Sequence, residues 1–317
     1  MTLRLMLGGL KSLLPVFHGG YKGAVGHTTG AYCYSVWMRH QTVIAQAIPP
    51  FRPKTVVELG PGDSLGIGCA ALLSGAERYI GLDVVDHASP EHDVLVLDEL
   101  VRLFERRAPI PDDQQFPNLL PRLASYAFPE RMFADDGPRN IRVDHDRVES
   151  IRAALLQRTR RLYDDVPLGY LTPWHARAVD RDSIDLVITQ AVLQDMAHGD
   201  RSSKLADTFA AMTSWLRTGG VMSHQINFAF PGGEPWNHHW RYSDAAWRVV
   251  RGNRPFFENR APLSTYLDLC AKHGCEVVSV KRVVQQGLPR DEVAPRFRDL
   301  PADDFDTASA HIVAVKR

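Results

Sequence analysis

Residues 55–59 form a short, almost wholly apolar stretch, and two glycines follow it at positions 60 and 62. A continuous apolar run of this length is typical of a strand buried on both faces of a sheet. The glycines allow a tight turn, and the apolar run LGIGCAALLSG continues as a helix that Gly75 can end. A second apolar stretch at 79–85 completes a strand–turn–helix–strand unit. The sequence therefore predicts the start of a parallel α/β sheet.

The alternation of strands and helices stops after this unit and resumes near residue 184. The interruption at about 88–165 contains two helical patterns, 97–107 and 146–165, separated by a proline-broken stretch. Their apolar stripes must be covered, so we expect a helical lid beside the sheet, or a layer through which a homo-oligomer forms.

The second half of the chain returns to the strand and helix pattern. A strand is expected at 184–192, a helix at about 200–217 capped by Gly219 and Gly220, and a strand at 221–228. The stretches CEVVSVKRVV and ASAHIVAVKR alternate like strands and are expected to pair as a terminal antiparallel hairpin. We predict a doubly wound, mostly parallel, Rossmann-like seven-stranded sheet. It occupies residues 51–317, behind an N-terminal helical cap at 1–50.

Composition excludes several other classes of protein. The 37 basic and 37 acidic side chains cancel, which argues against a nucleic-acid partner. No run of 18 or more apolar residues is present, so no transmembrane helix is expected and the expected location is cytoplasmic. The four cysteines form no CxxC pair and are expected to pack in the core. No metal site is expected either.

The residues around the glycine turn favour one type of cofactor. Asp83 ends the second strand, where a carboxylate can accept both hydroxyls of a ribose. A dinucleotide-binding turn requires a third glycine where this chain has Leu65. Glu58 precedes the turn, and its carboxylate would repel a pyrophosphate but suits a cationic cofactor with an amino group and a sulfonium. This chemistry indicates S-adenosyl-L-methionine.

The sequence resembles the class I S-adenosylmethionine-dependent methyltransferases. ELGPGDSLG resembles their acidic residue and glycine loop, and LDVV resembles the strand end with the ribose-binding acid. SIDLVITQAVLQDM and WLRTGGVMSH resemble the segments around their fourth and fifth strands. The resemblance covers roughly 50–87 and 166–230 and the terminal hairpin, with Tyr170 expected in an adenine-contacting loop. It implies that the cofactor-binding residues are Glu58, Gly60, Pro61, Gly62, Ser64, Asp83, Val84, Tyr170 and Gln190.

Histidines near the expected carboxyl edge of the sheet suggest how an acceptor could lose its proton. Methyl transfer to a hydroxyl needs a base, and histidine is suited to that task near pH 7. The candidates are His239 and His238, in a loop with three tryptophans, and His224 on the fifth strand. The leading helix adds Tyr32, Tyr34, Arg39 and His27 as further candidates for cofactor or substrate contact.

We therefore predict S-adenosylmethionine-dependent methyl transfer, most simply O-methylation of a small molecule or a saccharide with a histidine as general base. The aromatic loop beside polar residues suits the face of a sugar. The alternatives are a nicotinamide-dependent oxidoreductase and a non-catalytic cofactor-binding or scaffold module of the same fold.

Overall fold

The computed structural model describes residues 2–13, 28–48, 50–133, 141, 143–157, 166–196, 204–231, 233–254 and 256–317. In this part of the chain, strands form one sheet of order β3-β2-β1-β4-β5-β7-β6. The first five strands are parallel, and β7 lies antiparallel between β5 and β6. The strands are β1 (Thr55–Leu59), β2 (Arg78–Leu82), β3 (Leu168–Leu171), β4 (Ile184–Gln190), β5 (Leu216–Asn227), β6 (Cys275–Val284) and β7 (Thr307–Lys316). The predicted doubly wound sheet and terminal hairpin are confirmed.

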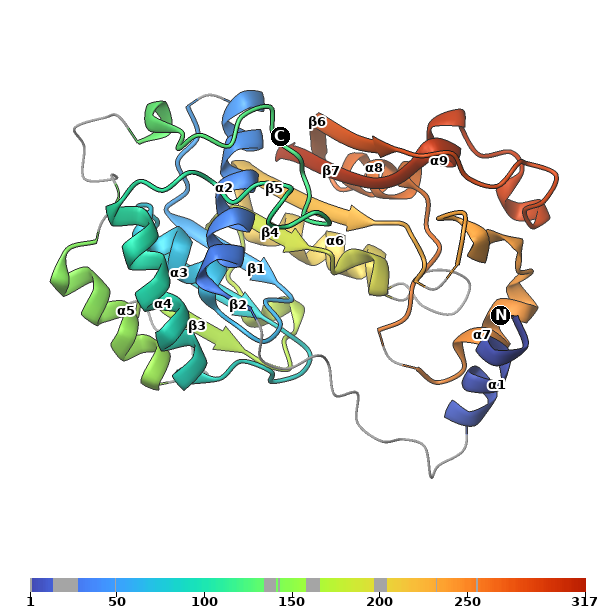
Figure 1. Cartoon of the computed structure of the whole chain (residues 1–317), viewed down its shortest axis with the longest axis horizontal. Coiled ribbons are helices and arrows are strands. Elements are labelled where there is room, and N and C mark those ends of the chain that lie inside the picture. Colours follow the sequence, from blue (N-terminus) through green and yellow to red (C-terminus); the bar gives the residue numbers. More distant parts are fainter. Residues whose placement is uncertain are drawn as a thin grey trace.

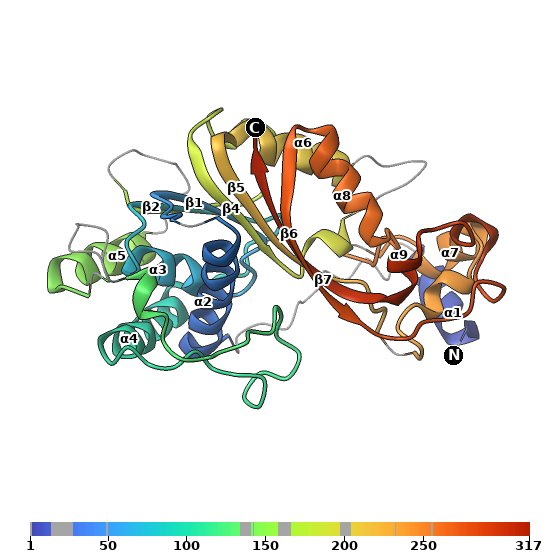
Figure 2. The same ribbon diagram turned by 90° about the horizontal axis from the view of Figure 1, so that it is seen from above.

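Helices cover both faces of the sheet (Figure 2). One face carries α2 (Gly30–Ala47), α3 (Gly66–Leu73), α4 (Pro90–Glu105) and α5 (His145–Gln157), and the other carries α6 (Lys204–Trp215) and α8 (Leu263–Lys272). Alternate side chains of β1 enter the two cores, since Val56 packs on the α2 side and Val57 on the α6 side. Burial on both faces explains why apolar residues occupy adjacent positions of the strand instead of alternating with polar ones.

Helix α2 is fixed at its N-terminus by polar contacts with its own cap and with α4. The Thr29 side chain accepts a hydrogen bond from the backbone N–H of Tyr32. The Glu99 carboxylate of α4 accepts two more, from Gly30 (2.7 Å) and Ala31 (3.1 Å). A negative charge at this end complements the helix dipole.

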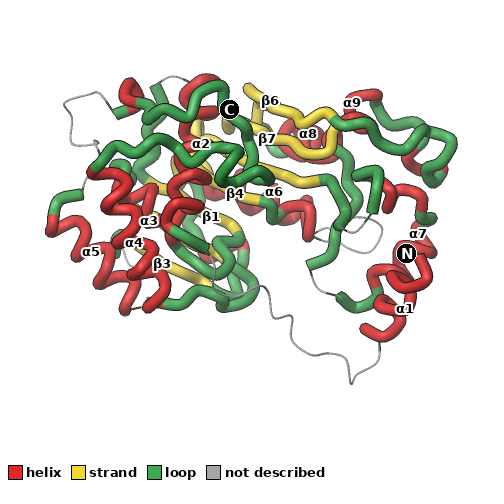
Figure 3. The backbone as a smooth tube through the Cα atoms, in the orientation of Figure 1, coloured by secondary structure: helices red, strands yellow, loops and turns green. Residues whose placement is uncertain are grey.

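In the described residues between β2 and β3, helices α4 and α5 are separated by a long stretch that is mostly loop (Figure 3). Helix α4 begins at Pro90, earlier than the predicted 97, because Ser89 supplies an N-cap and Pro90 suits the first turn. The loop contains the short 3₁₀ helix η2 (Glu130–Met132). Helix α5 is described as far as Gln157, and the remainder of the predicted helix to 165 lies outside the described residues.

Beyond the carboxyl ends of β4 and β5 lies a further group of short helices (Figure 1). Helix α1 packs against α7 so closely that a Cβ at Gly9 would lie 1.9 Å from the carbonyl oxygen of Val249. No helix among the described residues is both long and apolar enough to cross a membrane. The elements not yet named are α1 (Thr2–Ser12), η3 (Ala176–Ala178), η4 (Leu193–Asp195), η5 (His238–Arg241), α7 (Asp244–Arg251), η6 (Pro295–Phe297) and α9 (Ala302–Asp306).

The predicted role of Gly219 and Gly220 as a helix cap is wrong. Helix α6 ends at Trp215 and β5 begins at Leu216, so both glycines lie within the strand. Gly219 has φ +77°, and the pairing of β5 with β4 shifts register at this point. The glycines therefore form an irregularity in a strand, where a left-handed residue and close backbone approach are tolerated.

Candidate functional site

The glycine turn after β1 leaves room for a ligand at one of its two glycines. Gly60 and Gly62 both adopt left-handed conformations, with φ +76° and +71°. A Cβ at Gly60 would lie 2.6 Å from a methyl group of Val192, which follows β4. A Cβ at Gly62 would meet no atom within 4 Å. The backbone is thus packed at Gly60 and open at Gly62, so a ligand can approach it closely there.

Asp83 lies at this turn, directly after β2. One carboxylate oxygen accepts a hydrogen bond from the backbone N–H of Gly62 (3.1 Å), and the other accepts one from Val84 (2.7 Å). Asp83 is half-buried, and the neighbouring Val84 is 49% exposed. The structure therefore brings together the carboxylate and the glycine turn that the sequence analysis paired.

Glu58, the fourth residue of β1, is buried beside the turn without a cationic partner among the described residues. Its carboxylate accepts a hydrogen bond from the Tyr79 hydroxyl (2.6 Å), and the residue is 1% exposed. The pKa of Glu58 is raised to about 8, chiefly by burial. The Tyr79 hydrogen bond lowers it and the negative charge of Asp83 raises it, and both effects are included in that value. A cation bound nearby would stabilise the ionised form.

Other predicted cofactor-binding residues have their side chains in internal contacts. Ser64 is 1% exposed and donates to the Asp93 carboxylate of α4 (2.7 Å), which also accepts the N–H of Leu65 (2.9 Å). Tyr170 lies on β3 and not in the predicted loop, because its backbone pairs in register with β2. Its hydroxyl donates to the Val85 carbonyl (3.2 Å).

The N-terminal half of α2 contributes an aromatic side chain on the Glu58 side of the sheet. Tyr32 is largely buried and contacts the Phe116 ring edge-on, with 5.8 Å between ring centres. Burial raises the pKa of Tyr32, and the charges of Cys33, Glu58 and Asp63 add to the effect. Tyr34 donates to the Ala108 carbonyl (2.7 Å) and serves packing. His27 lies outside the described residues.

The three histidines considered as general bases are all buried. His239 is 1% exposed, and its ring lies among those of Phe230, Trp240 and Trp247. Burial lowers the pKa of His239 well below its ordinary value. His238, on the same 3₁₀ helix, is 3% exposed and also has a lowered pKa because of burial.

His224 on β5 has a comparable environment in the sheet. Its Nδ1 lies 3.0 Å from the Thr189 hydroxyl, and the residue is fully buried. Burial lowers the pKa of His224 to about 3, with a further contribution from His40. All three rings are therefore neutral at pH 7.

Two carboxylates at the carboxyl end of β4 were not among the site residues predicted from the sequence. Asp195 ends η4 and is partly exposed, and burial raises its pKa to about 6. Burial also raises the pKa of Glu258, and the charge of Asp195 adds to this effect, so the two groups interact. Asn259 ties the two segments together through hydrogen bonds to the Leu193 and Met196 carbonyls (2.9 and 3.0 Å). Asp195 is visible in the sequence as part of QDM (194–196), but no local pattern identifies Glu258 as the residue with which it interacts.

In the described residues, no three His, Cys, Asp or Glu side chains gather closely enough to hold a metal ion. The candidate site comprises the open turn at Gly62 and the acids Glu58 and Asp83, and Asp195 follows β4, the strand next to β1, at the same edge of the sheet. These groups suit a ribose, a cation and a proton to be removed.

Comparisons with known proteins extend this description. No family model and no curated protein matches the sequence. Similar solved structures include SAM-dependent methyltransferases from Methanosarcina mazei (9% identity, 86% of this chain and 96% of that chain, TM-score 0.44) and Mesorhizobium loti (13%, 87% and 98%, TM-score 0.42). Another is phosphoethanolamine N-methyltransferase 2 of Haemonchus contortus with S-adenosyl-L-methionine (12%, 91% and 57%, TM-score 0.41). The strand order itself, with β7 antiparallel between β5 and β6, is that of the class I methyltransferase fold.

Proposed function

We propose that this protein transfers the methyl group of S-adenosyl-L-methionine to a hydroxyl group of a small molecule or saccharide. The observation that carries the proposal is the Asp83 carboxylate held at the open side of the glycine turn, 3.1 Å from the Gly62 nitrogen. In a doubly wound sheet, ligands bind outside the carboxyl ends of the strands, where this turn lies.

The residues present fit this cofactor. Asp83 is the acceptor for the ribose hydroxyls, and the absence of any atom within 4 Å of a Cβ at Gly62 leaves room for the nucleoside beside the backbone. Pro61 belongs to the same turn, and Val84 offers an exposed apolar surface next to Asp83. The buried Glu58 carboxyl favours a positively charged ligand over a pyrophosphate. The cofactor supplies an activated methyl group when bound.

Proton removal from the acceptor is assigned to a side chain at the same edge. Asp195 is partly exposed, and its pKa of about 6 is close to the value that suits a general base near neutral pH. His239 remains the base expected from the sequence, but its ring is enclosed by aromatic side chains and 1% exposed. Accessibility therefore favours Asp195.

The cofactor assignment is tested by S-adenosylhomocysteine binding to Asp83→Ala and to a matched control, Asp180→Ala, which removes an exposed carboxylate elsewhere. Loss of hydrogen bonds to a charged group costs about 1–3 kcal/mol, so Asp83→Ala should weaken binding roughly 5- to 150-fold. Equal affinity in both variants, or tight binding of NAD by the parent protein, would overturn the proposal in favour of an oxidoreductase or a scaffold.

The base assignment is tested by methyl transfer to a panel of hydroxylated small molecules. We expect Asp195→Asn to lower turnover about 10²–10⁴-fold with nearly unchanged S-adenosylhomocysteine affinity. His239→Gln should mainly lower thermal stability. A turnover loss of that size in His239→Gln alone would assign the base to the histidine. Full turnover in both variants would mean that the enzyme needs no general base and only aligns the acceptor with the methyl group. A thiol or amine acceptor would then be favoured over a hydroxyl.

A further inference from the structure

A cavity of about 300 Å³ lies where the long loop after α4 meets the β6–β7 hairpin. Leu120, Pro121 and Arg122 line it from the loop, Lys281 and Arg282 from β6, and His311 from β7. This volume is at the lower end of the range for small-molecule sites. None of the residues assigned above to the cofactor or to the base lines it.

The lining of the cavity is positively charged. It includes Arg122 and Lys281 and no carboxylate, whereas the side chain of Arg282, next to Lys281 in the strand, points to the opposite face of the sheet. The Lys281 ammonium group donates to the Gln46 amide oxygen (2.9 Å), a neutral partner. Arg122 approaches Asp113 only to 3.7 Å, whereas Arg282 forms a close ion pair with Asp303 (2.7 Å). In the described part of the chain, Lys281 therefore has no acidic partner and Arg122 has a distant one.

A buried histidine with an unused ring nitrogen completes the lining. His311 is 1% exposed, and its Nε2 lies 3.0 Å from the Ser223 hydroxyl and 3.3 Å from Nδ1 of His40. Its own Nδ1 has no hydrogen-bond partner among the described residues. Its contacts with Ser223 and His40 hold His311 inside the cavity wall, and the enclosed Nδ1 is not available to a ligand in the cavity.

Hydrogen bonds connect the cavity wall to the edge of the sheet where the cofactor is proposed to bind. The side chain of Gln190, the last residue of β4, accepts from His40 (2.9 Å) and donates to the Leu120 carbonyl (3.3 Å). Ser309, also in the lining, pairs with Asn227, the last residue of β5. The cavity therefore lies near the carboxyl ends of β4 and β5, at the edge of the sheet where the cofactor is proposed to bind.

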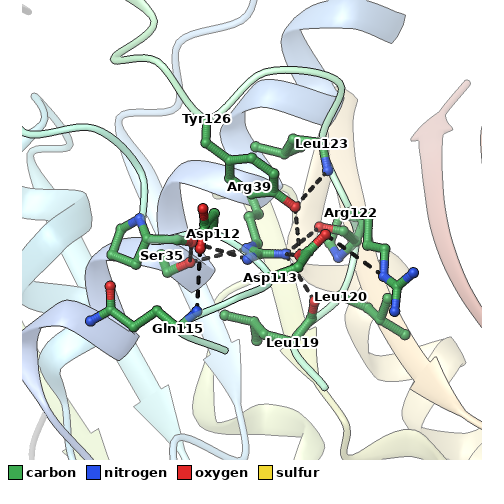
Figure 4. Close-up of polar contacts among 12 residues, drawn as sticks. Ser35, Arg39, Asp112, Asp113, Gln115, Leu119, Leu120, Arg122, Leu123 and Tyr126 are labelled. Atoms are coloured by element: carbon green, nitrogen blue, oxygen red, sulfur yellow. Dashed lines mark hydrogen bonds and ion pairs between the residues drawn. The ribbon is translucent and has the colours of Figure 1, made fainter. Parts of the chain in front are cut away.

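The loop that forms one wall is held in place by a buried arginine (Figure 4). The guanidinium group of Arg39 on α2 donates to the carbonyls of Pro111 (3.0 Å), Leu119 (2.8 Å) and Pro121 (3.0 Å). It also binds the Asp113 carboxylate at 3.0 Å, which accepts the Tyr126 hydroxyl as well. A wall fixed in this way is preorganised, which reduces the entropy lost on binding.

We propose that this cavity binds the anionic group of the methyl acceptor, a carboxylate or a phosphate, with Lys281 and Arg122 as counter-charges. The inference rests on the proposed function and makes its substrate an acidic, hydroxylated small molecule, such as an acidic saccharide or a sugar phosphate. Arg282 does not contribute, because its side chain lies on the opposite face of the strand and pairs with Asp303.

The test uses this protein saturated with S-adenosylhomocysteine and three probes that share a pyranose ring and differ at carbon 6: glucose, glucuronate and glucose 6-phosphate. Calorimetry should show at least one acidic probe binding at least tenfold more tightly than glucose, and which of them binds more tightly identifies the group as carboxylate or phosphate. Lys281→Met keeps the apolar stem and removes the charge, so it should weaken that binding tenfold or more. Lys272→Met, on the exposed end of α8, is the matched control and should bind like the parent.

Equal binding of the three probes, or an unchanged affinity in Lys281→Met, would overturn this inference. S-adenosylhomocysteine binding is measured first, without any probe. Its absence would overturn the proposed function itself, whereas intact cofactor binding without a preference for the acidic probes would overturn only the anionic acceptor.

Discussion

Replacing Arg39 with methionine should loosen the loop that follows α4. The guanidinium group is fully buried and donates five hydrogen bonds, to Ser35, Asp113 and the carbonyls of Pro111, Leu119 and Pro121 (Figure 4). Removing the guanidinium group leaves the buried carbonyl oxygens that it binds without a donor, at about 1–3 kcal/mol each, whereas Asp113 is 33% exposed and can be hydrated. We expect Arg39→Met to lose stability of that order.

Urea denaturation measures the loss in free energy of unfolding, and hydrogen exchange locates it. The backbone N–H of Leu119 donates to Phe116, and that of Leu123 to the Tyr126 hydroxyl, so both should lose protection. Amides in β4 and β5 should change only by the global loss. Arg241→Met is the control, because its ion pair with Glu292 is half exposed and contributes at most about 1 kcal/mol.

The reasoning would be refuted if Arg39→Met lost less than about 1 kcal/mol, the range expected of the exposed Arg241 pair. It would fail equally if the loop amides kept their protection relative to those of the sheet. Either result would mean that apolar packing holds the loop and that the buried hydrogen bonds add little.

Three further predictions concern buried groups. Gly68→Ala places a Cβ 2.3 Å from the Tyr79 ring, so it should cost about 1–3 kcal/mol in urea denaturation, and a cost under 0.5 kcal/mol would show that the ring shifts freely. The pKa values of His40 and His224 are lowered by burial from 6.5 to about 4 and about 3. As the pH decreases, the two histidines take up protons in the unfolded chain at a higher pH than in the folded protein. The free energy of unfolding should therefore fall between pH 6.5 and 4, by up to roughly 1.4 kcal/mol per pH unit for each ring. His40→Gln should flatten that dependence, and an unchanged slope would exclude His40 as a cause. Glu58, with a pKa of about 8, should release a proton when the cationic cofactor binds at pH 7, so the binding enthalpy should differ between phosphate and Tris buffers and should not differ in Glu58→Gln.

The glycine turn and its acid were predictable because their geometry follows from local sequence and parallel pairing. Leu59 and Leu82 are partners in the β1–β2 register, so the residues that follow them, Gly60 and Asp83, must meet at one edge. The hairpin of β6 and β7 was predictable from alternation for the same local reason.

Gly219 and Gly220 show where local pattern is insufficient. Two glycines after a helix match a C-cap and a strand irregularity equally well, and the pairing with β4 decides between them. That pairing depends on the assembled sheet and cannot be predicted from the local sequence. Tyr170 illustrates the same limit, because its strand forms only against β2.

The buried polar groups were the least predictable. His40 and His311 lie 271 positions apart in the sequence. Their rings meet only because helix α2 packs against strand β7. A histidine-rich, aromatic loop suggested an accessible site, yet the rings of Phe230 and Trp247 enclose His239. Asp195 was given no role from the sequence, because its burial and its interaction with Glu258 depend on segments that are distant in sequence.

The most direct test of the account is calorimetric titration of the parent protein with S-adenosylhomocysteine, S-adenosylmethionine and NAD. The open turn at Gly62, the Asp83 carboxylate and the buried Glu58 carboxyl predict saturable, one-to-one binding of both adenosyl compounds. They also predict no detectable binding of NAD, because Leu65 stands where a dinucleotide-binding turn has its third glycine. Binding of NAD without binding of either adenosyl compound would contradict the account.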